Sequence, residues 1–373
     1  MDTNEIFVIY GKDIRAMAIR LAEEANLAGL IGERGKRIGL KPNLVTAKPA
    51  SGGATTHPEI AAGLINYLKK NGFNNLAILE GSWTGGSTAE AFKVCGYRKL
   101  ADDAGLALID TKHDKTRACD CKGMKLEICE SGLSLDFMIN LPVMKGHCQT
   151  KMSCALKNNK GLIPDREKSR FHTLGLTKPI AHLNTVIRND FIVVDAICGD
   201  PDFELGGNPL YGGRLFAARD PVLCDAFAAA QMGYSLNDIP YIGAAEKLGI
   251  GCADLRTAKV RELNGADARE SAADAPSSTA PAGDKVRKLA PYIAGNNACS
   301  ACYASLVFAL SRMSRSKLDR LKEKICVGQG FQGKQGNLGI GQCCAAFTQS
   351  CPGCPPSGAD VLDFLNHFLM VHH

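Results

Sequence analysis

Aromatic residues and net charge are both scarce in this chain. Only 6% of its 373 residues are aromatic, with a single Trp, and the formal net charge is +6. Domains that bind nucleic acid carry strongly basic surfaces, and those that bind single strands add aromatic side chains on which bases stack. The sequence therefore argues against a nucleic-acid partner. The slight excess of positive charge suits small acidic molecules better than basic ones.

Long apolar runs are also missing from the sequence. No run reaches the roughly eighteen residues that a membrane span needs, and the acidic start at residues 1–5 does not resemble a signal peptide. We therefore expect a cytoplasmic protein without a membrane partner, in a compartment where thiols stay reduced. Sixteen cysteines in such a chain favour metal or cluster ligation over a disulfide scaffold.

Up to residue 263 the chain alternates short apolar strands with amphipathic helices. This alternation predicts an α/β fold, with a mostly parallel sheet and helices on both of its faces. The expected strands are 6–10, 37–41, 75–80, 106–110, 135–141 and 191–197. The expected helices are 13–30, 58–70, 88–95, 150–158, 179–188 and 221–232. Such sheets bind ligands at the carboxyl ends of their strands.

The composition changes after residue 263. Residues 264–287 are rich in Ala, Asp, Ser and Pro without an apolar period, which predicts a linker. Residues 288–373 are rich in Cys and Gly. The sequence thus predicts an α/β substrate-binding domain at 1–263, the linker at 264–287, and a small Cys-rich iron–sulfur unit at 288–373.

The Cys-rich part contains two Cys-x-x-Cys pairs. The first runs from Cys299 to Cys302 and the second from Cys351 to Cys354. A two-residue gap lets two thiolates reach one metal centre, and a Cys-Pro step like the one after Cys354 recurs in ferredoxin-type cluster sites. Between the pairs lies a doubled cysteine, Cys343-Cys344, and the lone Cys326 is interpreted as a buried cysteine without a ligand, so that six candidate thiols remain.

Six thiols suit an iron–sulfur cluster, most simply one with four irons and four sulfides. We expect its ligands to be Cys299, Cys302, Cys343 and Cys354, with Cys344 and Cys351 as substitutes. A structural zinc site could use the same two pairs, although their separation is long for a zinc ribbon. Buried cysteines without any ligand are the remaining alternative.

A basic segment precedes the middle of the chain. Residues 137–164 contain no acidic residue, yet they include Lys145, His147, Lys151, Lys157 and Lys160. Cations at the carboxyl end of a strand, beside free helix N–H groups, predict a site for a carboxylate or phosphate. A solvated basic face is the alternative.

Two residues of this segment are candidates for catalysis. Lys145, if desolvated and crowded by other cations, becomes a candidate base or nucleophile, and His147 a candidate for moving protons. On the expected helix at 150–158, Lys151 and Asn158 share one face. Other candidates end strands or lie beside them. The residues expected to bind substrate are Lys41, Asn43, His57, Lys151, Asn158, Asp195 and Asp225.

Several short motifs occur in order along the chain. They are Lys41-Pro42-Asn43, Thr56-His57-Pro58, Met144-Lys145-Gly146-His147, Lys157-Asn158, Lys160-Gly161, Asp195-Ala196-Ile197, Asp220-Pro221-Val222 with Asp225, and Gly353-Cys354-Pro355-Pro356. Together they resemble the family called domain of unknown function 362, over nearly the whole chain apart from the linker. Members of that family often carry ferredoxin-type or single-cluster extensions. The resemblance therefore implies a cluster on the four cysteines, but it implies no reaction.

The leading interpretation is an oxidoreductase. Its cluster would pass single electrons to or from a small anionic molecule, with a redox partner such as ferredoxin. One alternative is a lyase or isomerase whose cluster acts as a Lewis acid or only holds the tail together. The other is an electron-carrier or cluster-delivery protein without a substrate.

Overall fold

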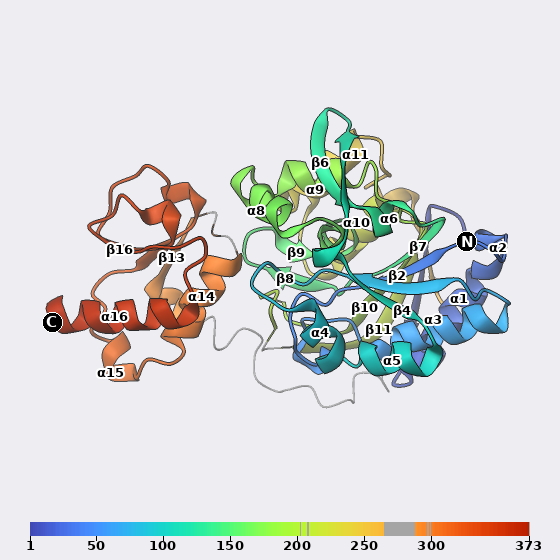
Figure 1. The fold of residues 1–373 in the computed structure, drawn as a ribbon, viewed down its shortest axis with the longest axis horizontal. Coiled ribbons are helices and arrows are strands. Elements are labelled where there is room, and N and C mark those ends of the chain that lie inside the picture. The colour runs from blue at the N-terminus through green and yellow to red at the C-terminus, as the bar shows by residue number, and fades with distance from the viewer. Residues whose placement is uncertain (202, 207–208, 265–287, 297, 299, 373) are drawn as a thin grey trace. The chain divides into compact units, whose positions relative to one another are not determined.

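The chain divides into two compact units (Figure 1). The computed structural model describes residues 1–201, 203–206, 209–264, 288–296, 298 and 300–372. The first unit comprises Met1–Gly146, Thr150–Pro201 and Leu205–Thr279. The second comprises His147–Gln149, Asp202–Glu204 and Ala280–His373.

An eight-stranded sheet forms the centre of the first unit. Its strand order is β12-β1-β11-β10-β7-β2-β3-β4, and only β11 runs antiparallel to its neighbours. The strands are β1 (Glu5–Tyr10), β2 (Ile38–Pro42), β3 (Leu76–Glu80), β4 (Ala107–Asp110), β7 (Phe137–Leu141), β10 (Phe191–Gly199), β11 (Leu210–Ala218) and β12 (Lys259–Glu262). Two further sheets have two strands each. One pairs β5 (Thr116–Cys121) with β6 (Met124–Cys129), and the other pairs β8 (Lys145–His147) with β9 (Lys151–Ser153).

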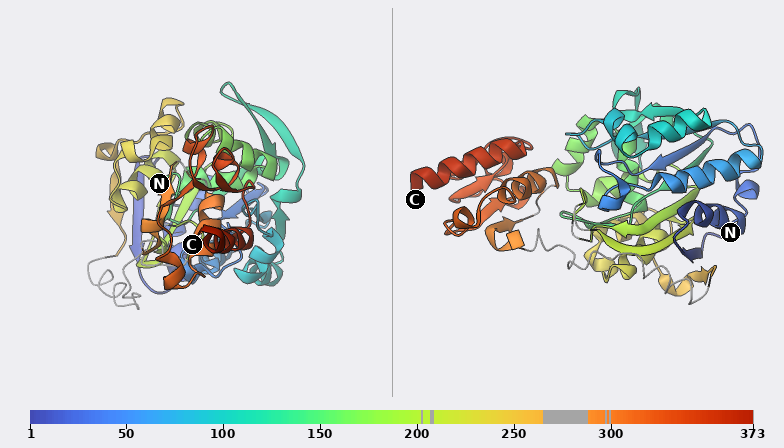
Figure 2. Two further views of the ribbon diagram at one scale, coloured as in Figure 1. Left: turned by 90° about the vertical axis from the view of Figure 1, so that its left-hand side faces the viewer. Right: turned by 90° about the horizontal axis from the view of Figure 1, so that it is seen from below.

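Helices cover both faces of this sheet (Figure 2). Side chains alternate along β1, so that Phe7 and Ile9 enter one hydrophobic core while Ile6 and Val8 enter the other. The first core contains α1 (Ile14–Glu24), α2 (Leu27–Ile31), α3 (Pro58–Lys70), α4 (Thr88–Val94) and α5 (Tyr97–Ala104). The second contains α7 (Ala155–Asn158), α8 (Asp165–Thr173), α9 (Thr177–Leu183), α10 (Pro221–Gln231) and α11 (Pro240–Lys247). The predicted α/β fold with a mostly parallel sheet is confirmed.

Three predicted helices differ from the structure, and the one expected at 179–188 corresponds to α9, which ends at Leu183. The helix expected at 13–30 is interrupted at Asn26, which has a φ of 49° and caps α2. The helix expected at 150–158 is wrong over its first half, because β9 occupies 151–153 and α7 is confined to Ala155–Asn158. Lys151 has a φ of 59°, which no helical residue adopts. Lys151 and Asn158 therefore do not share a helix face.

The second unit contains a sheet that the sequence did not predict. Its four strands are parallel, in the order β13-β14-β15-β16, and helices α14 and α16 pack against each other. The elements are β13 (Ile293–Gly295), α14 (Ser300–Leu310), α15 (Arg315–Leu318), β14 (Ile325–Val327), β15 (Leu338–Ile340), η8 (Gln342–Cys344), β16 (Gln349–Cys351) and α16 (Gly358–His372). Leu306, Ile325, Ile340 and Leu365 are fully buried in its core.

Most of the predicted linker lies outside the described residues. Its first residue, Asn264, is held in the first unit by two side-chain hydrogen bonds to the backbone of Tyr10, at 3.1 and 2.7 Å. Among the described helices, none has both the length and the apolar composition of a membrane-crossing segment.

Candidate functional site

Lys41, at the end of β2, lies against Glu80 at the end of β3. The Lys41 ammonium forms a hydrogen-bonded ion pair with the Glu80 carboxylate and donates to Pro42 O at 3.0 Å. Both residues are buried, at 0% and 3% exposure. Burial lowers the pKa of Lys41 and raises the pKa of Glu80, and the charge of each partner opposes that shift. The charge of Lys41 is therefore compensated within the protein.

Lys145 and Asn43 meet where β2, β7 and β8 come together. Lys145 is 1% exposed. Its ammonium donates to Asn43 Oδ1 at 3.2 Å and to Ala54 O. The Asn43 N–H donates to Thr56 Oγ1 at 2.8 Å, and the Thr56 hydroxyl donates to Leu141 O at 2.7 Å. Three segments that are far apart in the sequence are thus joined near the carboxyl ends of β2 and β7.

His57 and Asp195 form the second buried charge pair at this edge of the sheet. Both the backbone N–H and Nδ1 of His57 lie 2.8 Å from Asp195 Oδ2. The Asp195 side chain is fully buried, and that of His57 is 13% exposed. Burial lowers the pKa of His57, but the charge of Asp195 and the hydrogen bonds of Asp195 and Cys198 outweigh burial and raise it to about 11. His57 is therefore a cation at neutral pH.

We expect the His57 ring to stay protonated between about pH 6 and pH 9. Because its raised pKa belongs to the folded state, the stability from this pair is fully present below pH 6.5 and is lost as the pH rises towards 11. In Asp195→Asn the pKa should fall to its ordinary value or below, since burial then acts without the carboxylate. Histidine ring NMR, with the signal assigned in His57→Gln, measures both values. A wild-type midpoint near 6.5 would contradict this reading of the pair.

Asn158 belongs to a network of buried amide side chains. Its Nδ2 donates to Lys41 O at 3.2 Å and to Asn140 Oδ1 at 2.7 Å. Asn140 in turn donates to Asn189 Oδ1 at 2.8 Å, and Asn159 donates to Asn184 Oδ1 at 2.7 Å. Asn158 is 5% exposed. Its hydrogen bond to Lys41 O connects α7 to β2 and so helps to fix α7 against the sheet.

Asp225 caps a helix that is distant in sequence. Its carboxylate accepts the N–H groups of Ala155 at 2.7 Å and Leu156 at 3.2 Å, the first residues of α7. Burial raises the pKa of Asp225 to about 7, although these hydrogen bonds oppose the shift. Cys154 and Cys224 lie close enough to share an ion with Asp225. However, burial raises the pKa of both thiols, and the carboxylate oxygens are occupied by α7, so the group serves to position that helix.

The remaining lysines of the basic segment lie in different surroundings. Lys151 is exposed and pairs with Asp238 at 2.6 Å. Lys160 lies 3.5 Å from His172 Nε2. Burial, followed by the charges of Lys160 and Lys157, lowers the pKa of His172 to about 2. Sequence motifs did not link His172 to these lysines, because it lies on a different element, α8.

Cys302 and two loops of the second unit meet at Gly341. A Cβ on Gly341 would lie 3.0 Å from Cys302 Sγ and 3.6 Å from Gly353 O. The Gly341 N–H donates to Cys351 O, and the N–H of the next residue donates to Gly353 O, both at 2.8 Å. These bonds hold the segment that continues to Cys343 beside the segment that continues to Cys354. Cys299 lies outside the described residues.

The two substitute cysteines are packed differently. Cys344 is fully buried, with its Sγ 3.5 Å from Cys326 O, and burial with the neighbouring thiols raises its pKa to about 11. A Cβ on Gly339 would lie 3.0 Å from Cys344 Sγ. Cys351 belongs to the hydrophobic core of the unit. Cys302 belongs to the same core as Cys351, so a place in this core does not exclude Cys351 as a ligand.

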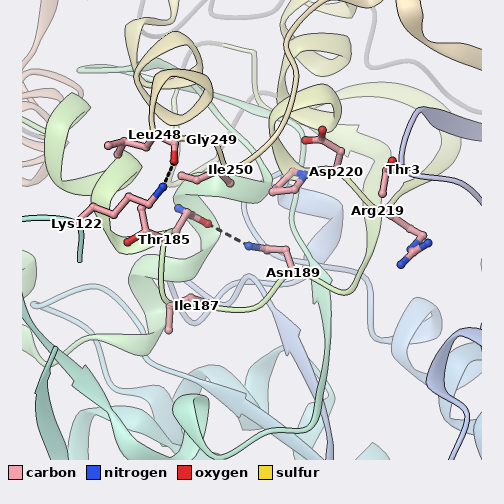
Figure 3. Close-up of a pocket in the computed structure, with 12 residues that line it drawn as sticks. Thr3, Lys122, Thr185, Ile187, Asn189, Arg219, Asp220, Leu248, Gly249 and Ile250 are labelled. Atoms are coloured by element: carbon pink, nitrogen blue, oxygen red, sulfur yellow. Dashed lines mark hydrogen bonds between the residues drawn. The ribbon is translucent and has the colours of Figure 1, made fainter. Parts of the chain in front are cut away.

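A cavity of about 280 Å³ lies elsewhere on the first unit (Figure 3). Thr3 and Asn189 line it and precede β1 and β10, so it lies at the amino ends of these parallel strands. Asp220 also lines it, and its carboxylate caps α10. None of the described residues around this cavity is a predicted site residue.

Fold and sequence define the chain as an α/β protein with a cysteine-rich second unit. It matches the family model "Domain of unknown function (DUF362)" over residues 38–230, more than half of its length, and it belongs to that family. The resemblance stated from the motifs is thereby confirmed.

Two further proteins are similar to parts of the chain. "Thylakoid-associated protein sll1697" from a Synechocystis species is 23% identical over 223 residues, which cover 58% of this chain and 69% of that protein. The lactate racemase apoprotein from Thermoanaerobacterium thermosaccharolyticum aligns with a TM-score of 0.34 and 16% identity, over 50% of each chain. This chain thus spans half the length of that enzyme, and a likeness of this extent does not define a common fold.

Proposed function

We propose that this protein carries a four-iron, four-sulfur cluster on Cys299, Cys302, Cys343 and Cys354. The approach of Cys302 to Gly341 carries the proposal, because the hydrogen bonds around Gly341 bring the flanks of Cys343 and Cys354 to the same point. Thiols are the donors that iron–sulfur clusters require. A bound cluster would supply single-electron transfer.

We further propose that the protein is an oxidoreductase acting on a small carboxylate or phosphate compound. Lys145 supports this, since it lies at the carboxyl ends of the strands, where sheets of this type bind ligands. The protonated His57 ring is a second cation at this edge and could donate a proton, but Asp195 compensates its charge as Glu80 compensates that of Lys41. Lys41 is a weaker candidate for anion binding, because Glu80 already compensates its charge. A ferredoxin-like partner would exchange the electrons.

Purification without oxygen tests the cluster directly. We expect a brown protein with about four iron and four sulfide ions per chain, whose visible absorption fades when dithionite reduces it. Iron, sulfide and zinc should be measured on the same sample. A colourless protein with stoichiometric zinc and no sulfide would replace the cluster by a zinc site on the same cysteines.

A further inference from the structure

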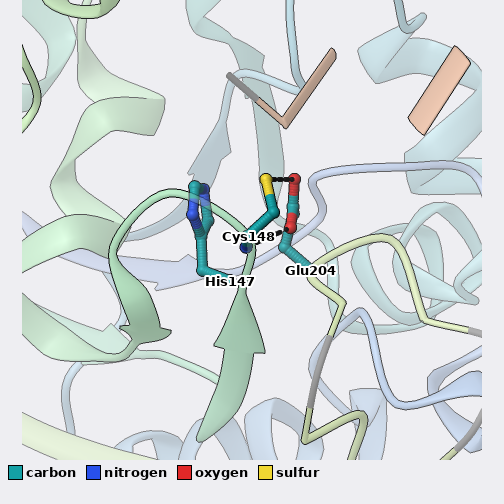
Figure 4. Close-up of side chains that lie close together, drawn as sticks. All are labelled: His147, Cys148 and Glu204. Carbon is teal, nitrogen blue, oxygen red and sulfur yellow. Dashed lines mark hydrogen bonds between the residues drawn. The ribbon is translucent and has the colours of Figure 1, made fainter. Parts of the chain in front are cut away.

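We propose that His147, Cys148 and Glu204 form a separate site for one divalent ion of the Zn²⁺ type. One ligand atom of each residue lies within 4.8 Å of the other two. Figure 4 shows the Cys148 thiol beside the Glu204 carboxylate, with the His147 ring on the other side of Cys148. None of the three belongs to the four cysteines proposed for the cluster.

Local contacts hold the ligand atoms together. The Cys148 N–H donates to Glu204 Oε2 at 3.2 Å, and Cys148 Sγ lies 3.6 Å from Glu204 Oε1. The N–H of Gln149 donates to His147 Nδ1 at 3.0 Å. Either mode of coordination would end this bond, because Nδ1 would then bind the ion or would carry the ring proton that left Nε2.

Burial explains why an ion would be bound strongly here. Glu204 is 3% exposed and His147 is 4% exposed. In a buried site the attraction between a carboxylate and a cation is screened less than it is in water. A divalent ion would compensate both this carboxylate and the Cys148 thiolate, and its binding would release the thiol proton.

The donor set selects the class of ion. Imidazole nitrogen and thiolate sulfur favour Zn²⁺ or Fe²⁺, whereas Mg²⁺ and Ca²⁺ require oxygen ligands. Three protein ligands leave the fourth position of a tetrahedral ion open. This is the arrangement of catalytic rather than structural zinc sites, so we infer that the ion would bind water or a substrate oxygen. His147 would then act as a metal ligand.

Zinc K-edge X-ray absorption of the full chain, loaded with one equivalent of zinc, tests the site without interference from iron. We expect one sulfur ligand at about 2.3 Å and nitrogen or oxygen ligands at about 2.0–2.1 Å. In Cys148→Ser the sulfur ligand should disappear, while iron and sulfide stay at the wild-type level. The exposed Cys252 provides the matched control, since Cys252→Ser should leave the spectrum unchanged.

Glu204→Gln gives a second test that does not depend on the thiol. Its zinc affinity should fall at least about tenfold, with the sulfur ligand retained. A spectrum with four sulfur ligands, or one that is unchanged in Cys148→Ser, would overturn the site. Loss of iron and sulfide in Cys148→Ser would also overturn it, because Cys148 would then be a cluster ligand. A wild-type protein without any cluster would refute the proposed function, whereas the effects of Cys148→Ser and Glu204→Gln on the bound zinc would still decide this site.

Discussion

Glu80→Gln should lower the free energy of unfolding of the first unit by about 3–5 kcal/mol, because it leaves the Lys41 ammonium buried without its carboxylate. The Lys41 side chain is 0% exposed and that of Glu80 is 5% exposed. A Cβ on Gly161 would lie 2.6 Å from both Glu80 Oε1 and Lys41 Nζ, so the backbone covers the pair closely. Such packing leaves little room for a water molecule that could hydrate the uncompensated Lys41 ammonium.

The single Trp of the chain, Trp83, makes this measurement specific to the first unit. It follows Glu80 by three residues, and its backbone N–H donates to Val45 O at 3.1 Å. Unfolding in urea, followed by Trp83 fluorescence, should show the loss in Glu80→Gln. The double variant Lys41→Met/Glu80→Gln should recover most of it, since no buried charge is then left unpaired.

The exposed Glu90 offers a matched control for the same chemical change. Glu90→Gln should alter the free energy by no more than about 0.5 kcal/mol, as surface substitutions usually do. If Glu80→Gln were as mild as Glu90→Gln, the ion pair would contribute nothing to stability. The pair would then have to be explained by its position at the strand ends, where a ligand could compete for Lys41.

Six strands of the central sheet, β1, β2, β3, β4, β7 and β10, could be predicted from their apolar runs, whereas β11 and β12 of the same sheet were not. The bounds expected for α3, 58–70, agree with the structure, since Pro58 at the first helical position marks the start. The segment at 150–158 failed for a long-range reason. Asp225, some seventy residues later, caps α7 at Ala155, and a window around the helix contains no sign of that contact.

Short strands were missed for a different reason. β13, β14, β15 and β16 have three residues each, which is too few to display a period of two. The Cys-x-x-Cys pairs could be recognised from their spacing alone. The sheet that positions these cysteines could not be predicted.

Candidate residues were easier to predict than their partners. The rule that ligands bind at strand ends selected Lys41, Asn43, Lys145 and Asp195 from the sequence. The rule does not specify which strands are neighbours. Because β2 lies between β3 and β7, Lys41 meets Glu80, which no motif suggested. The same holds for His57 and Asp195, which are 138 residues apart.

Cys302→Ser should abolish the cluster, and Gly341→Ala should reduce it several-fold. Gly341 has a φ of 88°, and a methyl group there would approach Cys302 Sγ to 3.0 Å. The substitution therefore combines two effects, a backbone strain of about 1–3 kcal/mol and displacement of the thiol. Iron and sulfide per chain, measured after purification without oxygen, report the loss.

Gly333 separates these two effects. It also has a positive φ, 74°, but a Cβ there would meet no atom within 4 Å. Gly333→Ala thus carries the strain without the contact and should keep the wild-type content of iron and sulfide. Cys344→Ser should keep it as well, because the Cys344 thiol packs against Gly339 in the core. Equal losses of iron and sulfide in Gly333→Ala and Gly341→Ala would attribute the effect to folding of the second unit. A full cluster in Cys302→Ser would show that Cys302 is not a cluster ligand.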